Sequence, residues 1–251
     1  MTRALPRTNF NSSKLSRVLA GLGLAAADAP APTFADRLGG WLGAADAMRL
    51  YAAHNTAAAG AATTTTVPAE LAAEGERLRA ALAQNIEKSC TPGAGGTRPK
   101  LPVPDPAAPL EVAADYEPYR RFQLAHQREM ETAIAPLRAK ARAALAQATP
   151  ALAKLAALDA AFGDILAGRE ARLLAAVPAL LERRFAQLRD AHRQALAAAG
   201  QTDDPAAWLQ PDGWLARFCT DLQAALLAEL ELRLQPVTGL IEAFSNEVSP
   251  Q

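Results

Sequence analysis

The segment LLAAVPALLERRFAQLRDAHRQAL, residues 173–196, decides the fold of this chain. Leucine, valine and phenylalanine recur in it every three to four residues, which is the spacing of one face of an α-helix. Pro178 stands inside this pattern, where a proline removes one backbone hydrogen bond and costs about 3 kcal/mol. The segment therefore predicts a helix that bends at Pro178, and it raises the question of whether this bend is a functional hinge.

The apolar stripe extends in both directions and predicts one helix from Pro150 to Ala199. Thr149 and Pro150 are typical of a helix start, because threonine caps the first turn and proline is favoured at the first helical position. Gly200 is typical of the residue just beyond a helix end. The predicted stripe consists of Leu155, Leu158, Phe162, Leu166, Leu173, Val177, Leu181, Phe185 and Leu188.

Residues 116–147 predict a second long helix, which can form an antiparallel hairpin with residues 151–177. Counting from the turn at 149–150 places Pro178 opposite about residue 121, near the start of the first arm. The remainder of the long helix then needs another partner, which a leucine-rich helix over 213–235, bent at its end by Pro236, supplies. Pro178 would lie where the long helix changes partner, and this favours a bend between packing partners over a hinge.

The N-terminal part predicts helices over 12–25 and 34–54 and a third that begins at Val67 and Pro68. The apolar stripe of the second consists of Phe34, Leu38, Trp41, Ala45, Met48 and Ala52. Six prolines over 91–109 predict an extended spacer. We expect an all-α protein: an N-terminal helical region (1–90), a Pro/Gly-rich linker (91–112) and a bundle built on a long antiparallel hairpin with kinked helices and an acidic C-terminal helix (113–251).

Composition excludes several classes of protein. Lysine plus arginine and aspartate plus glutamate number 26 each, so no net basic charge points to nucleic acid. No apolar run approaches the roughly 20 residues that span a bilayer. Cys90 and Cys219 form no disulfide framework, which favours a reducing cytoplasm. A basic N-terminus before VLAGLGLAAADAPA leaves a secretory signal as an alternative to a structural helix capped by Asn11, Ser12 or Ser13.

Candidate catalytic and metal-binding patterns are sparse. The segment GAGGTRPK lacks the strand, the lysine position and the hydroxyl residue of a phosphate-binding loop. His126 and Glu129 lie three residues apart on one helix face, but a carboxylate metal bundle needs Glu-x-x-His on two helices. We therefore expect no metal, no cofactor and no catalytic residue. His126, Glu129 and His192 are the candidate polar site if the chain has one.

A candidate interaction surface lies along the 116–147 helix. It consists of Arg120, Arg121, Arg128, Arg138 and Arg142. Acidic residues are interleaved with these arginines, and such a mixture is more typical of a solvated face than of a nucleic-acid surface.

Four stretches together resemble an uncharacterised proteobacterial family, domain-of-unknown-function family 3348. They are RTNFNSSKLSRVLAGL, FADRLGGWLGAADAMRL, YRRFQLAHQREMETAIAPLRAKARAAL and LAALDAAFGDILAGREARLLAAVPALLERRF. The resemblance implies that the N-terminal helix belongs to the family's domain. It also implies an association with the cell envelope, because similar proteins are encoded near envelope proteins. It transfers no catalytic residues.

These observations favour a non-enzymatic helical interaction or scaffold protein with a protein partner, as the cytoplasmic part of an envelope-associated assembly. A helical nucleic-acid or regulatory binding protein is the alternative, and an enzyme with a site between helices is the third hypothesis. A continuous basic surface would favour the second, and a deep pocket in which His126 or His192 faces carboxylates would favour the third.

Overall fold

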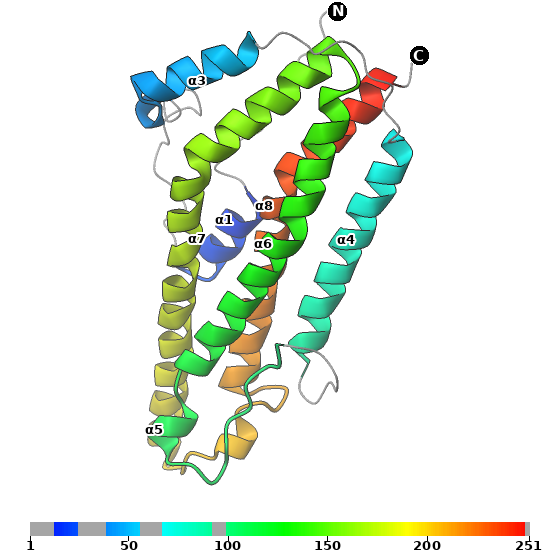
Figure 1. Ribbon diagram of the computed structural model, residues 1–251. Helices are drawn as coiled ribbons and strands as arrows, with labels where there is room; N and C mark the ends of the chain where they lie inside the picture. The colour runs from blue at the N-terminus through cyan, green and yellow to red at the C-terminus, as the bar shows by residue number, and fades with distance from the viewer. Residues whose placement is uncertain (1–12, 25–38, 56–66, 92–98, 249–251) are drawn as a thin grey trace, which may run out of the picture.

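The fold is a bundle of long helices (Figure 1). The computed structural model describes residues 13–24, 39–55, 67–91 and 99–248, and these ranges contain helices and no strand, which confirms the all-α prediction. The elements are α1 (Lys14–Gly21), α3 (Ala44–His54), α4 (Pro68–Ser89), α5 (Leu110–Ala113), α6 (Glu117–Ala146), α7 (Pro150–Ala199), the short 3-10 helix η2 (Pro205–Ala207) and α8 (Trp214–Val248).

The hairpin of α6 and α7 forms as the sequence predicts. Thr149 caps α7, since its hydroxyl accepts a hydrogen bond from the backbone N–H of Leu152 at 3.3 Å. Gly200 ends α7 in the left-handed conformation at φ 64°, which glycine adopts without the steric cost of a side chain. Both boundaries of the 50-residue helix are thus set by local chemistry.

The centre of the bundle is α8, which packs against α1, α4, α6 and α7. Its predicted stripe is buried: Trp214, Phe218, Leu222, Leu226, Leu230 and Leu234. The predicted end at residue 235 is wrong, because α8 continues through Pro236 to Val248. Leu240, Ile241 and Phe244 beyond this proline are also buried, and their packing offsets the lost hydrogen bond.

Pro178 lies where α7 changes partner. The hydroxyl of Tyr116, at the start of α6, donates a hydrogen bond of 2.8 Å to the carbonyl of Pro178, as the hairpin count predicts to within a few residues. Beyond this point α7 also packs on α8, and Arg184 binds Asp221 there at 2.8 Å. Pro178 is buried, and α7 continues through it.

The N-terminal helices share the core of the long hairpin. Leu15 of α1 and Leu71 of α4 belong to the same buried cluster as the stripe of α8. After α4 the chain returns to it at Leu101, whose backbone N–H donates to the carbonyl of Ser89 at 3.2 Å. The same buried cluster therefore contains residues from both sides of the predicted linker, and Leu101 from within it. The cap of α1 is Ser13, one of the three predicted residues.

Two predicted stripes need correction. Met48 of α3 is 68% exposed and Leu173 of α7 is 63% exposed, whereas the neighbouring Leu174 is buried. The helix α3 lies across α7 as an outer element, and the indole of Trp41 stacks on the guanidinium of Arg169 at 4.6 Å. Phe34, Leu38 and the phosphate-loop-like segment up to Arg98 lie outside the described residues.

Candidate functional site

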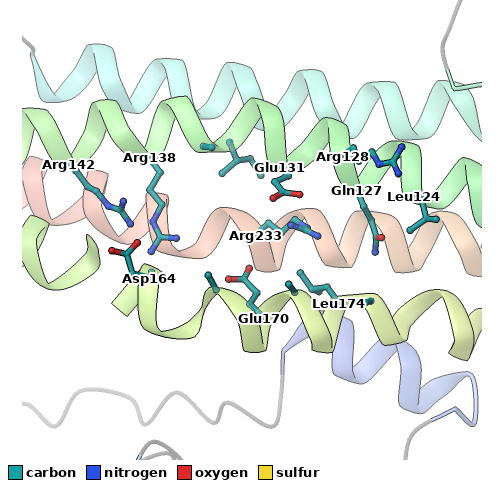
Figure 2. Close-up of a pocket in the computed structure, with 16 residues that line it drawn as sticks. Leu124, Gln127, Arg128, Glu131, Arg138, Arg142, Asp164, Glu170, Leu174 and Arg233 are labelled. Atoms are coloured by element: carbon teal, nitrogen blue, oxygen red, sulfur yellow. The ribbon is translucent and has the colours of Figure 1, made fainter. Parts of the chain in front are cut away.

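A groove of about 510 Å³ opens between α6 and α7, with α8 as its floor (Figure 2). We call it the α6–α7 groove. Its α6 wall consists of Leu124, Gln127, Arg128, Glu131, Ile134, Ala135, Arg138 and Arg142. Its α7 wall consists of Gly163, Asp164, Ala167, Glu170, Ala171, Leu174 and Ala175, and Arg233 comes from α8. The volume is within the range of protein ligand sites.

Small residues keep the groove open. Gly163, Ala167, Ala171 and Ala175 follow one another at intervals of four residues, which places them along one side of α7. Ala135 faces the groove from α6. Because these positions carry at most a methyl group, the space between the two helices is not filled by side chains. The spacing is visible in the sequence, but its effect depends on how far α6 and α7 diverge.

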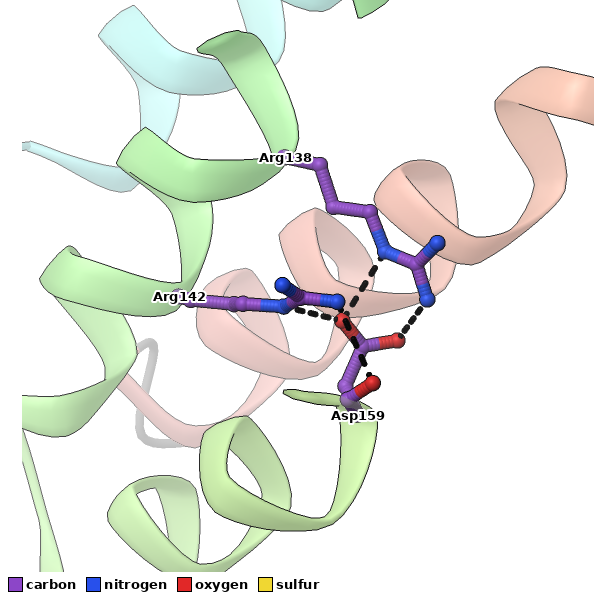
Figure 3. Close-up of polar contacts among 3 residues, drawn as sticks. All are labelled: Arg138, Arg142 and Asp159. Carbon is purple, nitrogen blue, oxygen red and sulfur yellow. Dashed lines mark hydrogen bonds and ion pairs between the residues drawn. The ribbon is translucent and has the colours of Figure 1, made fainter. Parts of the chain in front are cut away.

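One end of the groove is built by a carboxylate shared between two arginines (Figure 3). Arg138 binds the two carboxylate oxygens of Asp159 at 2.9 and 2.6 Å. Arg142 binds the same carboxylate at 2.6 Å and the backbone carbonyl of Asp159 at 3.1 Å. Burial alone would raise the pKa of Asp159, but the hydrogen bonds from the two arginines outweigh it and hold this pKa below its usual value.

Gly163 makes room for this cluster. A methyl group at this position would lie 2.9 Å from an Nη atom of Arg142 and 3.8 Å from one of Arg138. Glycine inside a helix costs about 1 kcal/mol relative to alanine. Its presence here is explained by the guanidinium groups that pack against it.

The floor of the groove is a neutral polar pair. Arg233 binds Glu229 at 2.8 Å, and the amide of Gln127 donates to both oxygens of the same carboxylate at 2.9 and 3.1 Å. Glu229 is fully buried, and Arg233 and Gln127 supply the hydrogen bonds that its carboxylate needs there. The sequence pattern gave no sign of this pair, because Glu229 lies among the leucines of α8.

The remaining charges of the groove are unpaired. Within the described residues, Arg128, Glu131, Asp164 and Glu170 make no ion pair closer than 4.0 Å. Figure 2 shows Glu131 and Glu170 on opposite walls with Arg233 between them. These four residues carry one positive and three negative charges, and the two arginines that share Asp159 leave one further positive charge, so the groove has a small acidic excess.

The structure divides the five arginines of the predicted interaction surface. Arg128, Arg138 and Arg142 line the groove. Arg120 and Arg121 lie near the start of α6, where both contact Glu117, at 3.3 and 3.6 Å. Asp159 and Glu117 each contact two of these arginines, so the two carboxylates interrupt the basic surface on this part of α6 and offset two of its five positive charges.

His126 takes part in an arrangement that resembles a catalytic triad. Its Nε2 lies 2.8 Å from the hydroxyl of Ser89, and its Nδ1 lies 3.5 Å from Glu129, which accepts two hydrogen bonds from Asn85. The hydroxyl of Ser89 also donates to the carbonyl of Ile86 at 2.9 Å, so this carbonyl competes with Nε2 of His126 for the single hydroxyl proton.

Access and electrostatics also argue against catalysis at His126. The side chains of His126 and Ser89 are 1% and 2% exposed. Burial lowers the pKa of His126 to about 4, far from the pH at which a general base works well. Ser89 ends α4, where a helix presents carbonyl groups and not the N–H groups of an oxyanion hole. The arrangement holds α4 and α6 together.

His192 lies elsewhere, near the turn between α7 and α8. Its Nε2 is 2.9 Å from Asp203, whose Oδ1 also accepts a hydrogen bond from the indole of Trp208 at 2.7 Å. Burial would raise the pKa of Asp203, but its hydrogen bonds from Trp208 and His192 lower it. The structure therefore does not combine His126, Glu129 and His192 into one site. Each histidine is held by its own neighbours.

The cysteines and possible metal ligands offer no further site. Cys90 and Cys219 are free and buried, and burial raises the pKa of both thiols to about 12, which makes them poor nucleophiles. Among residues 13–24, 39–55, 67–91 and 99–248, no three histidine, cysteine or acidic side chains are grouped to hold a metal ion. In the same ranges no helix is both long and apolar enough to cross a bilayer.

Comparison with known proteins gives one match. A family model described as "Protein of unknown function (DUF3348)" matches residues 1–246. No curated protein and no solved structure matches the chain.

Proposed function

The chain belongs to the DUF3348 family of proteins of unknown function, and from its site geometry we propose that it is a non-enzymatic interaction protein whose α6–α7 groove binds a partner protein. The observation that carries the proposal is the groove itself: about 510 Å³, with small residues along its α7 wall and both charged and apolar side chains in its lining. Grooves of this kind between helices are typical docking sites for helical segments.

The contrast with the polar residues elsewhere in the bundle supports a binding role over an enzymatic one. The best arrangement for catalysis, Ser89 with His126 and Glu129, has its serine and histidine buried, and the carbonyl of Ile86 competes for the serine proton. The α6–α7 groove contains arginines and carboxylates, but within its described lining no serine, cysteine or histidine that would act as a nucleophile or base.

The proposed location is the cytoplasm, in an assembly associated with the cell envelope. Free, buried thiols at Cys90 and Cys219 support a reducing compartment. The family resemblance supports a partner at the envelope. The nucleic-acid alternative is weakened, because Asp159 and Glu117 contact four of the five arginines on α6 and offset part of their charge.

Site-specific crosslinking in a bacterial host of this family tests the proposal. A photoreactive amino acid replaces Ala171 on the groove wall, and a control protein carries it at Ala176, which is exposed on α7 and outside the groove. We expect a discrete protein adduct from position 171 only. The adduct should vanish when Ala167→Trp fills the groove and persist with Ala176→Trp.

Two results would contradict this function. One is an equal set of adducts from positions 171 and 176. The other is an adduct that survives Ala167→Trp in a protein whose thermal unfolding shows that the bundle is intact.

A further inference from the structure

We propose that the partner segment is a basic helix that places a lysine or arginine between Glu131 and Glu170. This inference rests on the proposed function and adds the chemistry of the partner. It follows from which charges of the groove already have a partner within the chain.

The first argument is the charge at the middle of the groove. Arg233 and its buried partner Glu229 form a neutral pair at 2.8 Å. Glu131 and Glu170 stand on either side of this pair without a cation of their own (Figure 2). One guanidinium among three carboxylates leaves two negative charges. An incoming cation would reduce this repulsion.

The second argument is the charge at the two ends. Arg138 and Arg142 share Asp159, and Asp164 lies on the facing wall of the same end. Two bases and two acids cancel there. Arg128 is the one free base, at the opposite end of the groove. The groove as a whole therefore has its free charge at Glu131 and Glu170, with no excess of bases for an acidic partner.

The third argument is shape. The α6 wall runs from Leu124 to Arg142, and eighteen residues of helix span about 27 Å. A trough of this length matches about five turns of a partner helix lying along it. Gly163, Ala167, Ala171 and Ala175 leave the α7 wall almost smooth, so a partner backbone can approach closely. The partner needs small apolar residues on the face that carries its cation.

Fluorescence anisotropy with designed peptides tests this chemistry on the full chain. Three labelled, alanine-rich peptides of 18 residues are identical except for two central residues four positions apart, which are arginine, glutamine or glutamate. We expect the arginine peptide to bind about tenfold tighter than the glutamate peptide, and its affinity to fall as salt is raised.

Matched variants of the protein locate the binding. The double variant Glu131→Gln with Glu170→Gln should weaken the arginine peptide about tenfold and leave the glutamine peptide unchanged. The control double variant Glu87→Gln with Glu111→Gln removes two exposed carboxylates outside the groove and should change neither. Thermal unfolding of both variants shows that the fold persists.

Several results would overturn the inference. One is a glutamate peptide that binds as tightly as the arginine peptide. Another is an affinity for the arginine peptide that does not change in the double variant Glu131→Gln with Glu170→Gln. Full displacement of the peptide by an equal concentration of spermidine would show a site for small polycations. A dimer that dissociates in the groove variant would make a second copy the occupant.

The inference and the proposed function fail in different ways. A groove-specific crosslink with no preference for the arginine peptide would retain the docking function and reject a basic partner. The absence of any groove-specific crosslink would reject the function itself.

Discussion

Two segments of α7 differ in their packing: a closed segment, whose apolar side chains are buried against neighbouring helices, and an open segment, which borders a groove. Residues 177–188 bury Val177, Leu181, Phe185 and Leu188 against α6 and α8. Residues 163–175 carry glycine and alanine at intervals of four and border the α6–α7 groove. The two segments differ in side-chain volume and not in secondary structure. Helix formation alone therefore does not decide where this bundle is sealed.

The closed segment owes its packing to aromatic rings. Phe185 lies 5.0–5.6 Å, between ring centroids, from Tyr116, Tyr119, Trp214 and Phe218, mostly in tilted or edge-to-face contacts. Such pairs add stability beyond the burial of apolar area. In the open segment charged side chains take the place of rings. We expect substitutions in the closed segment to affect stability, and substitutions in the open one to affect binding.

The largest expected effect is at Phe185. Phe185→Ala removes a ring that is 2% exposed and leaves a cavity among four aromatic neighbours. It should lower the free energy of unfolding by about 3–5 kcal/mol. Leu173→Ala, in the open segment, should change it by less than about 0.5 kcal/mol. Urea unfolding measures both, and similar losses in the two variants would refute the distinction between the segments.

The second expected effect concerns His126, a polar group buried in the bundle between α4 and α6. Its pKa is about 4 in the folded chain and about 6.5 when unfolded, so between these values the unfolded chain binds a proton that the folded chain does not. Stability should be full above pH 6.5 and fall by about 3 kcal/mol as the pH drops to 4. His126→Gln should flatten this part of the profile, whereas His192→Gln should leave it in place.

A smaller effect is expected at Pro178, in the closed segment next to its border with the open one. Tyr116→Phe removes the hydrogen bond to the carbonyl of Pro178 and should cost about 1 kcal/mol. Pro178→Ala restores one backbone N–H and should change stability by less than about 1 kcal/mol, with partner binding retained. If Pro178→Ala keeps its urea midpoint but loses the crosslink at position 171, the bend is a determinant of binding and not a simple accommodation.

The smallest effect sharpens the comparison within the open segment. Gly168→Ala should stabilise the chain by about 0.5–1 kcal/mol, because a methyl group there meets no atom within 4 Å. Gly163→Ala should gain less or lose stability, because the methyl group displaces Arg142 from Asp159. Equal gains in thermal unfolding would show that the arginine cluster does not require glycine.

Local chemistry predicts much of the hairpin from the sequence. Thr149, Pro150 and Gly200 mark the ends of α7, and counting along the hairpin places Pro178 near the start of α6. These predictions succeed because caps and hairpin register depend on residues close in sequence or on simple geometry. Pro136 does not interrupt the predicted 116–147 helix, but Pro236 misleads, because tertiary packing keeps α8 continuous through it.

The groove could not be predicted from the sequence, for a different reason. The arginines of α6 look like a basic surface until Asp159, on the next helix, is known to bind two of them. Leu173 matches the apolar period but points outward, because a period fitted over 33 residues drifts around a real helix. The available signal in the sequence was the spacing of small residues at Gly163, Ala167, Ala171 and Ala175. These residues border a cavity only because α6 and α7 diverge.

The central place of α8 has a consequence for how the chain is made. Leu15 and Leu71 are buried against a helix that follows them by roughly 150–200 residues, so they leave the ribosome well before their partner exists. At about 5–20 residues per second this delay is about 10–40 seconds. During that time α1 and α4 expose apolar faces, while α6 and α7 can already pair. The last helix to be synthesised therefore completes the packing of the first one. A chaperone that shields α1 and α4 would act in this interval.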